Sequence, residues 1–260
     1  MADVSLRTEQ RGATAVITLD RPEAMNAFDA QLVEKLTAAF ANASRDASVR
    51  AILLQAEGRA FSAGADLGWM RAMADAPDAE NLDDARRLAR LMRTVDICPK
   101  ATFARVQGAA FGGALGLIAC CDVAIASGDA VFCVSEVRLG LIPAVIGPYL
   151  VRAVGARAAR RLTVTAERFG AAEALQLGLV HAVADTGGLD AAVEQSLASA
   201  LEGGPEAIAA AKALVADLSR PVDDEMMDDT AKRIAAIRAG AEAREGVAAF
   251  LQKRKPGWRT

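Results

Sequence analysis

Histidine is almost absent from this sequence, which has only one, His181, in 260 residues. Zinc sites in proteins commonly use imidazole nitrogens together with thiolates or carboxylates, so a metal centre is not expected. Serine–histidine–aspartate and cysteine–histidine mechanisms also need an imidazole to move a proton. The scarcity of histidine therefore directs the search for chemistry to carboxylates and to the backbone.

Cysteine is also sparse, and its spacing predicts neither a disulfide framework nor a metal-binding pair. The four cysteines are Cys98, Cys120, Cys121 and Cys133, and none forms a C-x-x-C pair. Three of them lie in apolar runs, which is typical of buried thiols. A chain of this length can build a core without disulfide bonds. We expect reduced cysteines and a cytoplasmic protein.

Aromatic residues make up only 4% of the chain, whereas alanine is abundant, which favours close-packed helices over a β-sandwich. The net charge is −3 and the pI is about 5.4. A nucleic-acid-binding surface usually carries a basic excess, so no nucleic-acid partner is expected. The one basic cluster lies in the tail, at Lys253, Arg254, Lys255 and Arg259.

The sequence also lacks a convincing hydrophobic anchor. The longest apolar stretch, residues 108–126, is interrupted by glycines and contains Asp122. It is too short and too rich in glycine to span a bilayer as a helix. The first ten residues are polar and lack the apolar centre of a signal peptide. We therefore expect no membrane partner.

What the sequence does contain is an alternation of strand and helix patterns. Short apolar runs predict strands at residues 15–19, 49–55, 101–106, 123–126 and 131–134. Helical patterns cover residues 31–42, where Asp29 is the predicted cap, and residues 75–95 and 114–121. This alternation predicts an α/β domain with largely parallel strands.

The last quarter of the chain has a different pattern. Beyond about residue 195 only helical periodicity is found, near residues 204–218, 225–238 and 241–253. We predict two parts: a core of residues 1–195 that carries the site, and a helical oligomerisation region of residues 196–260.

Two glycine-rich segments are candidate ligand-binding loops. Residues 61–67 (FSAGADL) are small enough for a ligand to approach the backbone, and Gly64 allows a positive φ. Residues 108–114 (GAAFGGA) precede an apolar helix, whose first N–H groups are unpaired and favour negative charge. Such a helix start can hold an oxyanion or a phosphate. Tight packing of the turns would also explain the glycines.

Glu136 is the candidate catalytic carboxylate. It follows a predicted strand and lies among apolar neighbours in residues 132–143 (FCVSEVRLGLIP). Loss of hydration would raise its pKa toward the range useful for proton transfer. An ion pair with Arg138 or another arginine is the alternative interpretation.

Taken together and in this order, these segments resemble the enoyl-CoA hydratase/isomerase (crotonase) family. The resemblance begins at residues 19–27 (LDRPEAMNA) and extends to residues 250–254 (FLQKR). It implies a crotonase-type spiral of repeated ββα units with a C-terminal helical region that forms homotrimers, often paired into homohexamers. It implies an acyl-CoA substrate and no separate cofactor, because CoA is part of that substrate.

The resemblance also implies roles for single residues. The N–H groups of Ala65 and Gly113 would form an oxyanion hole, and Glu136 would move the proton. Lys253 would reach a CoA phosphate, often from a neighbouring subunit. The CoA adenine and ribose would lie along the backbone of Ala24, Met25, Ala27, Ala63, Asp66 and Leu67.

The sequence departs from the family pattern at one position. Hydratases with two glutamates carry one of them six residues before Asp122, where this chain has Gly116. A single carboxylate suits a 1,3 proton shift, which favours an isomerase. Residues 112–122, 135–144 and 165–169, however, resemble bacterial methylglutaconyl-CoA hydratases of leucine breakdown. The main prediction is therefore a hydratase of a branched acyl-CoA, with an isomerase as the first alternative. A non-catalytic homologue that binds CoA or RNA is the second.

Overall fold

The computed structural model of the protein describes residues 5–185, 187–218 and 224–259. Six of the described strands form one sheet in the order β1-β2-β3-β5-β7-β10. Only β1 and β2 pair in antiparallel fashion, and the other neighbours are parallel. The strands are β1 (Leu6–Arg11), β2 (Thr14–Leu19), β3 (Ala51–Ala56), β5 (Ala101–Val106), β7 (Val123–Ser127) and β10 (Ala182–Ala184).

Four shorter strands form a second sheet in the order β4-β6-β8-β9, in which only β8 and β9 are antiparallel. They are β4 (Ala60–Ser62), β6 (Ala109–Phe111), β8 (Val131–Cys133) and β9 (Arg168–Gly170). Each of the pairs β3/β4, β5/β6 and β7/β8 therefore places one strand in each sheet. Helices follow each pair, which confirms the predicted spiral of ββα units.

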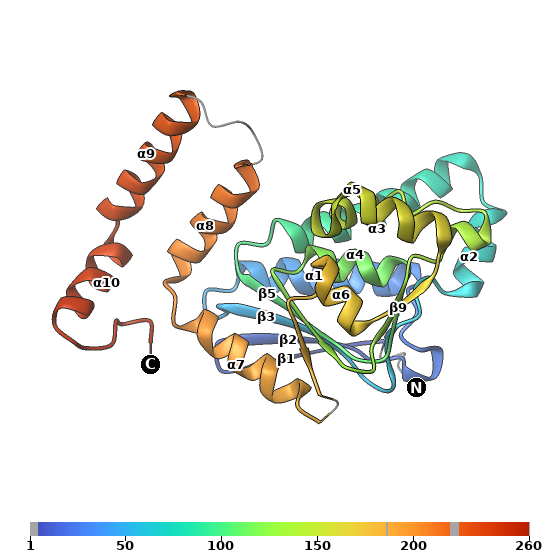
Figure 1. Ribbon diagram of the computed structural model, residues 1–260, viewed down its shortest axis with the longest axis horizontal. Helices are drawn as coiled ribbons and strands as arrows, with labels where there is room; N and C mark the ends of the chain where they lie inside the picture. Colours follow the sequence, from blue (N-terminus) through green and yellow to red (C-terminus); the bar gives the residue numbers. More distant parts are fainter. Residues whose placement is uncertain (1–4, 186, 219–223, 260) are drawn as a thin grey trace.

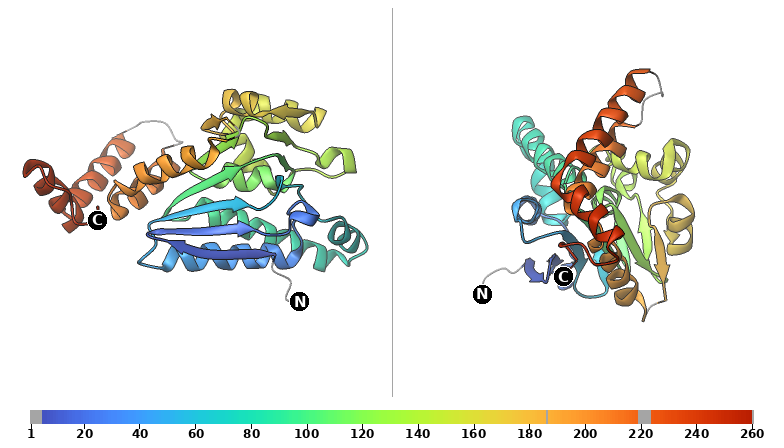
Figure 2. Two further views of the ribbon diagram at one scale, coloured as in Figure 1. Left: turned by 90° about the horizontal axis from the view of Figure 1, so that it is seen from below. Right: turned by 90° about the vertical axis from the view of Figure 1, so that its left-hand side faces the viewer.

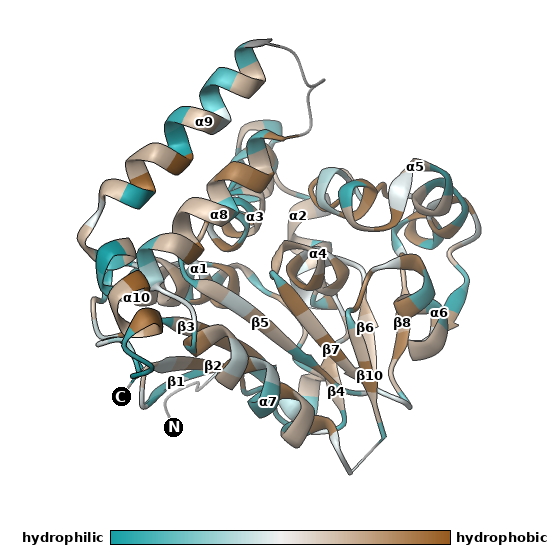
Figure 3. Ribbon diagram, turned by 60° about the vertical axis from the view of Figure 1, so that its left-hand side comes forward, coloured by the Kyte–Doolittle hydropathy of each residue, from teal (hydrophilic) through white to brown (hydrophobic). Residues whose placement is uncertain are grey.

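The helices of the core cover one face of the large sheet (Figure 1). They are α1 (Ala30–Arg45), α2 (Leu67–Ala74), α3 (Asp78–Asp96), α4 (Gly113–Cys120), α5 (Gly147–Thr165) and α6 (Ala171–Leu177), with 3₁₀ turns η1 (Pro22–Ala24) and η2 (Glu136–Leu139). The Asp29 side chain caps α1 by accepting the Leu32 N–H at 2.8 Å, as predicted. Helix α4 is buried almost throughout, and Figure 3 shows hydrophobic residues concentrated in the strands beneath it.

The C-terminal helices beyond α7 (Leu189–Leu201) extend away from the sheets (Figures 1 and 2). Helix α7 packs Leu189, Val193 and Leu197 on the opposite face of the large sheet. It crosses residue 195, where the sequence analysis places the boundary between the two parts, and that boundary stays a prediction. Beyond it, α8 (Pro205–Asp217), α9 (Asp224–Ala239) and α10 (Ala241–Leu251) project to one side (Figures 1 and 2).

Several elements differ from the sequence-based expectation. The elements β1, β9, β10, α2, α5 and α6 have no counterpart among the predicted ones, and strands β4 and β6 lie in segments predicted as loops. Each of β4 and β6 has only three residues, too few for a period of two to be recognised. These two strands matter for the site, because Ala65 and Gly113 follow them within three residues. Within the described residues, no helix has the length and apolar character needed to cross a bilayer.

Candidate active site

Two segments far apart in sequence, residues 25–28 and 63–66, lie side by side at one edge of the core. The Ala63 N–H donates to the Met25 carbonyl at 2.9 Å, and the Phe28 N–H donates to the Gly64 carbonyl at 2.7 Å. The Asp66 N–H donates back to the Phe28 carbonyl at 2.8 Å. This parallel bridge uses the peptide groups on either side of Ala65, so the N–H of Ala65 itself points away from Phe28.

The two predicted glycine-rich loops are in direct contact. Gly64 has a φ of +90°, and a Cβ atom added there would lie 2.9 Å from the Phe111 carbonyl oxygen. Gly112 has a φ of +53° and lies next to Gly64. Only glycine permits this approach and this backbone conformation. The loop that carries Ala65 and the loop that carries Gly113 therefore meet at their backbones.

Both candidate N–H donors are available to a ligand. Gly113 is the first residue of α4, where a helix leaves its N–H groups unpaired. Across the described residues, neither the Ala65 N–H nor the Gly113 N–H is donated to an acceptor of the chain. Both residues are half-buried. An oxyanion site needs two unpaired donors close together, and these two lie on loops that are in contact.

Glu136 lies beside these loops. Its Oε1 would be 3.3 Å from a Cβ atom at Gly112, the residue that precedes Gly113. Its Oε2 is buried and has no hydrogen-bond partner, and the carboxylate forms no ion pair within the described residues. Burial raises the pKa of Glu136, and the backbone of Glu136 and Ser135 lowers it only in part. The alternative of an ion pair with Arg138 is not found, and Arg138 is exposed.

The place of the missing second glutamate is filled with hydrocarbon. A Cβ atom at Gly116 would lie 2.4 Å from Cγ2 of Ile146 and 3.0 Å from Sδ of Met92. Ile146 comes from the segment after Glu136, and Met92 comes from α3. A longer side chain at position 116 would have to displace both residues. Near the start of α4, position 116 is therefore packed against the side chains of Ile146 and Met92.

Most residues of the expected CoA site lie on the two paired segments. Met25 is 39% exposed and Leu67 is 77% exposed, so the surface of these segments can be reached. Lys253, in contrast, is exposed just beyond α10, at the opposite end of the molecule from α2 (Figure 1). The structure thus brings together residues 24–27 and 63–67 and leaves Lys253 apart from them within one chain.

Two other carboxylates, Asp66 beside the site and Asp122 at the far end of α4, have structural partners. Asp66 caps α2 by accepting the N–H groups of Gly68 and Trp69. Asp122 accepts the N–H and the hydroxyl of Thr102 at 2.7 and 2.9 Å and also pairs with Lys212. Neither carboxylate is therefore free to take the place of the absent glutamate.

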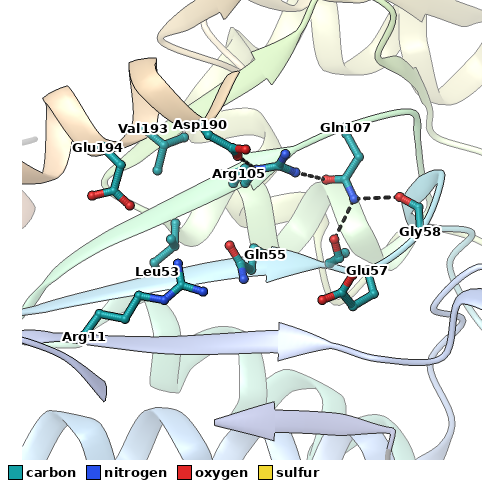
Figure 4. A pocket seen from close by; sticks show the side chains of 11 residues that line it. Arg11, Leu53, Gln55, Glu57, Gly58, Arg105, Gln107, Asp190, Val193 and Glu194 are labelled. Atoms are coloured by element: carbon teal, nitrogen blue, oxygen red, sulfur yellow. Dashed lines mark hydrogen bonds and ion pairs between the residues drawn. The ribbon is translucent and has the colours of Figure 1, made fainter. Parts of the chain in front are cut away.

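A polar cavity of about 450 Å³ lies elsewhere, between α7 and the strands of the large sheet (Figure 4). Arg105 pairs there with Asp190 and donates to Gln107. None of the predicted site residues lines this cavity. Among the described residues, no group of three or more metal-binding side chains is found either.

Two buried polar residues support the site and were not singled out from the sequence. Asn26 donates to the carbonyls of Glu57 and Ala60 at 2.9 Å each and accepts the Arg21 N–H at 2.8 Å. The Ser62 hydroxyl accepts the Gly64 N–H at 3.1 Å. A polar residue in an apolar run, as at Ser62 in the segment 60–65, is the signal that could have indicated such a role.

Comparison with known proteins gives a family match over nearly the whole chain. The family described as Enoyl-CoA hydratase/isomerase matches residues 9–260. The crystal structure of an enoyl-CoA hydratase from Shewanella pealeana is 47% identical, with a TM-score of 0.95 over 98% of this chain and 96% of that one. Among relatives, a crotonyl-CoA hydratase of Syntrophomonas wolfei is 31% identical over 98% of both chains. A trans-2-decenoyl-(acyl-carrier-protein) isomerase of Streptococcus mutans is 30% identical over 93% of both chains.

Proposed function

The chain belongs to the enoyl-CoA hydratase/isomerase family, and we propose that it hydrates a 2-enoyl-CoA through an enolate held by the N–H groups of Ala65 and Gly113. The observation that carries this proposal is the position of Glu136, whose buried Oε2 has no hydrogen-bond partner, beside the two loops that carry the unpaired donors. The family relation makes the protein an enzyme that acts on acyl-CoA thioesters.

In the proposed reaction, the two N–H groups stabilise charge on the thioester oxygen. When a nucleophile adds at Cβ, the electrons of the double bond move to the carbonyl oxygen and an enolate forms. The donors belong to the backbone and are fixed before the reaction, so they need no reorganisation in the transition state. Loss of one such donor typically costs about 3–4 kcal/mol of barrier.

Glu136 would serve as both base and acid. Its carboxylate takes a proton from water as the water oxygen bonds to Cβ. The carboxylic acid so formed then gives a proton to Cα, which returns Glu136 to its ionised form. One water molecule is consumed and no other group changes its protonation state. The raised pKa of Glu136 favours this double role, because a carboxylate that binds its proton more tightly is a stronger base toward water.

We propose that the acyl group is branched and carries a second carboxylate, as in 3-methylglutaconyl-CoA. The resemblance of residues 112–122 and 135–144 to hydratases of that substrate supports this choice. Arg138 is exposed two residues after Glu136 and has no ion-pair partner within the described residues, so its guanidinium could bind the distal carboxylate.

Isomerisation of a 3-enoyl-CoA is the second candidate, and the packing at Gly116 favours it. Ile146 and Met92 exclude a second carboxylate there, and a 1,3 proton shift needs only one. Glu136 would take a proton from Cα and return it to Cγ, with the same enolate between the two steps. The choice between the two reactions then depends on whether water reaches Glu136.

We propose that the working form is a homotrimer or a homohexamer. Apolar residues on α9 and α10 support this, since Ile234, Val247 and Phe250 are 53%, 59% and 82% exposed. A trimer could also place Lys253 of one subunit near the CoA-binding segments of the next. CoA is then the only non-protein group needed for the reaction.

The reaction is tested by incubating the protein separately with crotonyl-CoA, 3-methylglutaconyl-CoA and a 3-enoyl-CoA in water enriched in oxygen-18. Each product is analysed by mass. A hydratase adds one labelled oxygen to a 2-enoyl substrate, whereas an isomerase moves the double bond with no change in mass.

The expected result is labelled hydration, fastest with 3-methylglutaconyl-CoA. Isomerisation of the 3-enoyl substrate without hydration would replace the first candidate by the second. No turnover of any substrate would overturn both.

A further inference from the structure

Helix α2 begins directly after the proposed oxyanion loop. Ala65 is followed by Asp66, whose side chain caps the helix, and then by Leu67, the first helical residue. Because the chain is continuous, the position of the first turn of α2 determines how the Ala65 peptide is oriented. Any contact that holds this turn therefore bears on the position of the Ala65 N–H.

Trp69 connects this turn to helix α3. Its backbone N–H donates to Oδ1 of Asp66 at 3.2 Å, and its indole Nε1 donates to Oδ1 of Asp84 at 3.2 Å. Trp69 is half-buried and packs against the main hydrophobic core. One residue thus joins the cap of α2 to a side chain on the neighbouring helix.

Asp84 is a carboxylate at a buried position on α3. It is only 7% exposed, and burial raises the pKa of its carboxyl group. Its nearest cation is Arg87, with Nη2 at 3.9 Å from Oδ1. Two apolar side chains would join α2 to α3 without the cost of burying a carboxylate. A hydrogen bond to the indole adds a fixed direction that apolar packing does not provide.

The same face of α3 reaches the other half of the site. Asp84, Leu88 and Met92 are spaced four residues apart and so lie along one side of the helix. Met92 contacts the position of Gly116 on α4, the helix that begins at Gly113. One face of α3 therefore touches both the turn that follows Ala65 and the helix that begins at Gly113.

We propose that Asp84 is a positioning residue for the oxyanion hole: through the Trp69 indole it fixes the first turn of α2 and thereby the Ala65 N–H. This inference rests on the proposed function, since it assigns Asp84 to the same site. Asp84 touches no substrate and acts through Trp69 and Asp66.

The test compares Asp84→Leu, Asp84→Asn, Trp69→Phe and the double variant Asp84→Leu/Trp69→Phe. Leucine removes the acceptor and phenylalanine removes the donor, whereas asparagine keeps an acceptor oxygen. We expect kcat to fall about 10- to 100-fold in both Asp84→Leu and Trp69→Phe, with KM nearly unchanged. Asp84→Asn should retain most of kcat. The double variant should be no slower than either single one, because both remove the same interaction.

Amide hydrogen exchange gives a readout that does not depend on turnover. Asp84→Leu should speed exchange in the peptide that spans residues 62–72 and leave the strands of the large sheet unchanged. Unchanged exchange in that peptide would overturn the inference, and so would a kcat of Asp84→Leu equal to that of an active wild type. If the wild type itself turns over no enoyl-CoA, the proposed function fails, and exchange still decides whether Asp84 positions the loop.

Discussion

At the scale of single residues, burial and chemistry act against each other at Glu136. A carboxylate with one buried oxygen that has no hydrogen-bond partner is less stable in its ionised form than one at the surface. The same environment raises the pKa of Glu136 above its ordinary value, which is the direction that favours proton transfer by a carboxylate. The protein thus keeps at Glu136 an arrangement that weakens its folded state.

Glu136→Gln should therefore stabilise the fold at neutral pH by roughly 1 kcal/mol, because it removes a charge from a carboxylate whose Oε2 is buried without a hydrogen-bond partner. The raised pKa means that the folded state binds this proton more tightly than the unfolded state does. The stability due to protonation is present in acid and is lost as pH rises through the folded pKa. The gain from glutamine should then shrink as pH falls.

Urea denaturation of the wild type and the variant at acidic and neutral pH measures this difference. Glu34→Gln, at an exposed position on α1, should change the stability very little. A Glu136→Gln protein that is less stable than the wild type at neutral pH would contradict the argument.

Gly116 is the second residue whose role follows from contacts. Gly116→Ala should destabilise the protein by roughly 1–3 kcal/mol, because its Cβ would lie 2.4 Å from Ile146. Gly116→Ala should cost less in an Ile146→Ala background than in the wild type, since Ile146→Ala removes Cγ2, the nearest contacting atom. Thermal unfolding measures both effects.

Gly147→Ala is the matched control. Gly147 follows Ile146 directly in the sequence, and no atom lies within 4 Å of a Cβ added there. Equal losses at positions 116 and 147 would show that backbone flexibility, and not the Ile146 contact, determines the cost.

At the scale of elements, the contact between two loops creates the proposed oxyanion hole. Gly64→Ala should lower kcat by about 10²–10³-fold, because the new Cβ would push the Ala65 loop away from the Phe111 carbonyl. Gly12→Ala, in the turn between β1 and β2, also places alanine at a positive φ, here +57°, with no atom within 4 Å of the added Cβ. Steady-state kinetics of both variants separate strain from displacement, and equal kcat values would exclude displacement.

Some helices and strands can be predicted from the sequence and others cannot. The buried face of α1, with Leu32, Leu36 and Phe40, follows directly from its periodicity, and the Asp29 cap was predicted with it. Strands β4 and β6 could not be predicted, since each has three residues and is stabilised by pairing with the other across distant parts of the chain. Helix α2 was not predicted, because its N-terminus follows a run of small residues that is typical of a loop.

The candidate site shows the same limit. Glu136 and both loops were singled out from sequence, but their proximity depends on tertiary contacts that no local pattern contains. The absent carboxylate at position 116 was visible in the sequence, whereas its replacement by Ile146 and Met92 was not. Asp84 gave no signal, because one aspartate on a helix with many charges resembles a solvated residue.

At the scale of the whole molecule, the C-terminal helices carry apolar surface that one chain does not cover. Phe250 and Leu251, at the end of α10, are 82% and 73% exposed. We expect the wild type to have the mass of a trimer or hexamer and Phe250→Asp to shift it toward smaller species, because a charge at a buried interface is costly. Light scattering after size exclusion measures the masses. A monomeric wild type would contradict the proposed assembly.

Lys253 is the residue through which oligomerisation would contribute to CoA binding. If a neighbouring subunit places this residue at the CoA site, Lys253→Gln should raise KM several-fold for acyl-CoA and leave kcat nearly unchanged, since the lost ion pair contributes only to binding. Arg259→Gln is a control in the same tail, because Arg259 pairs with Glu202. Equal KM values for the wild type and Lys253→Gln would remove Lys253 from the site.

The most direct test of the central claim is the turnover of Glu136→Gln, measured together with its binding of the acyl-CoA. The account predicts that kcat falls by at least about 10²-fold, while the dissociation constant for a non-reactive acyl-CoA stays near that of the wild type. A variant that binds and still turns over the substrate at a rate close to wild type would show that another group moves the proton.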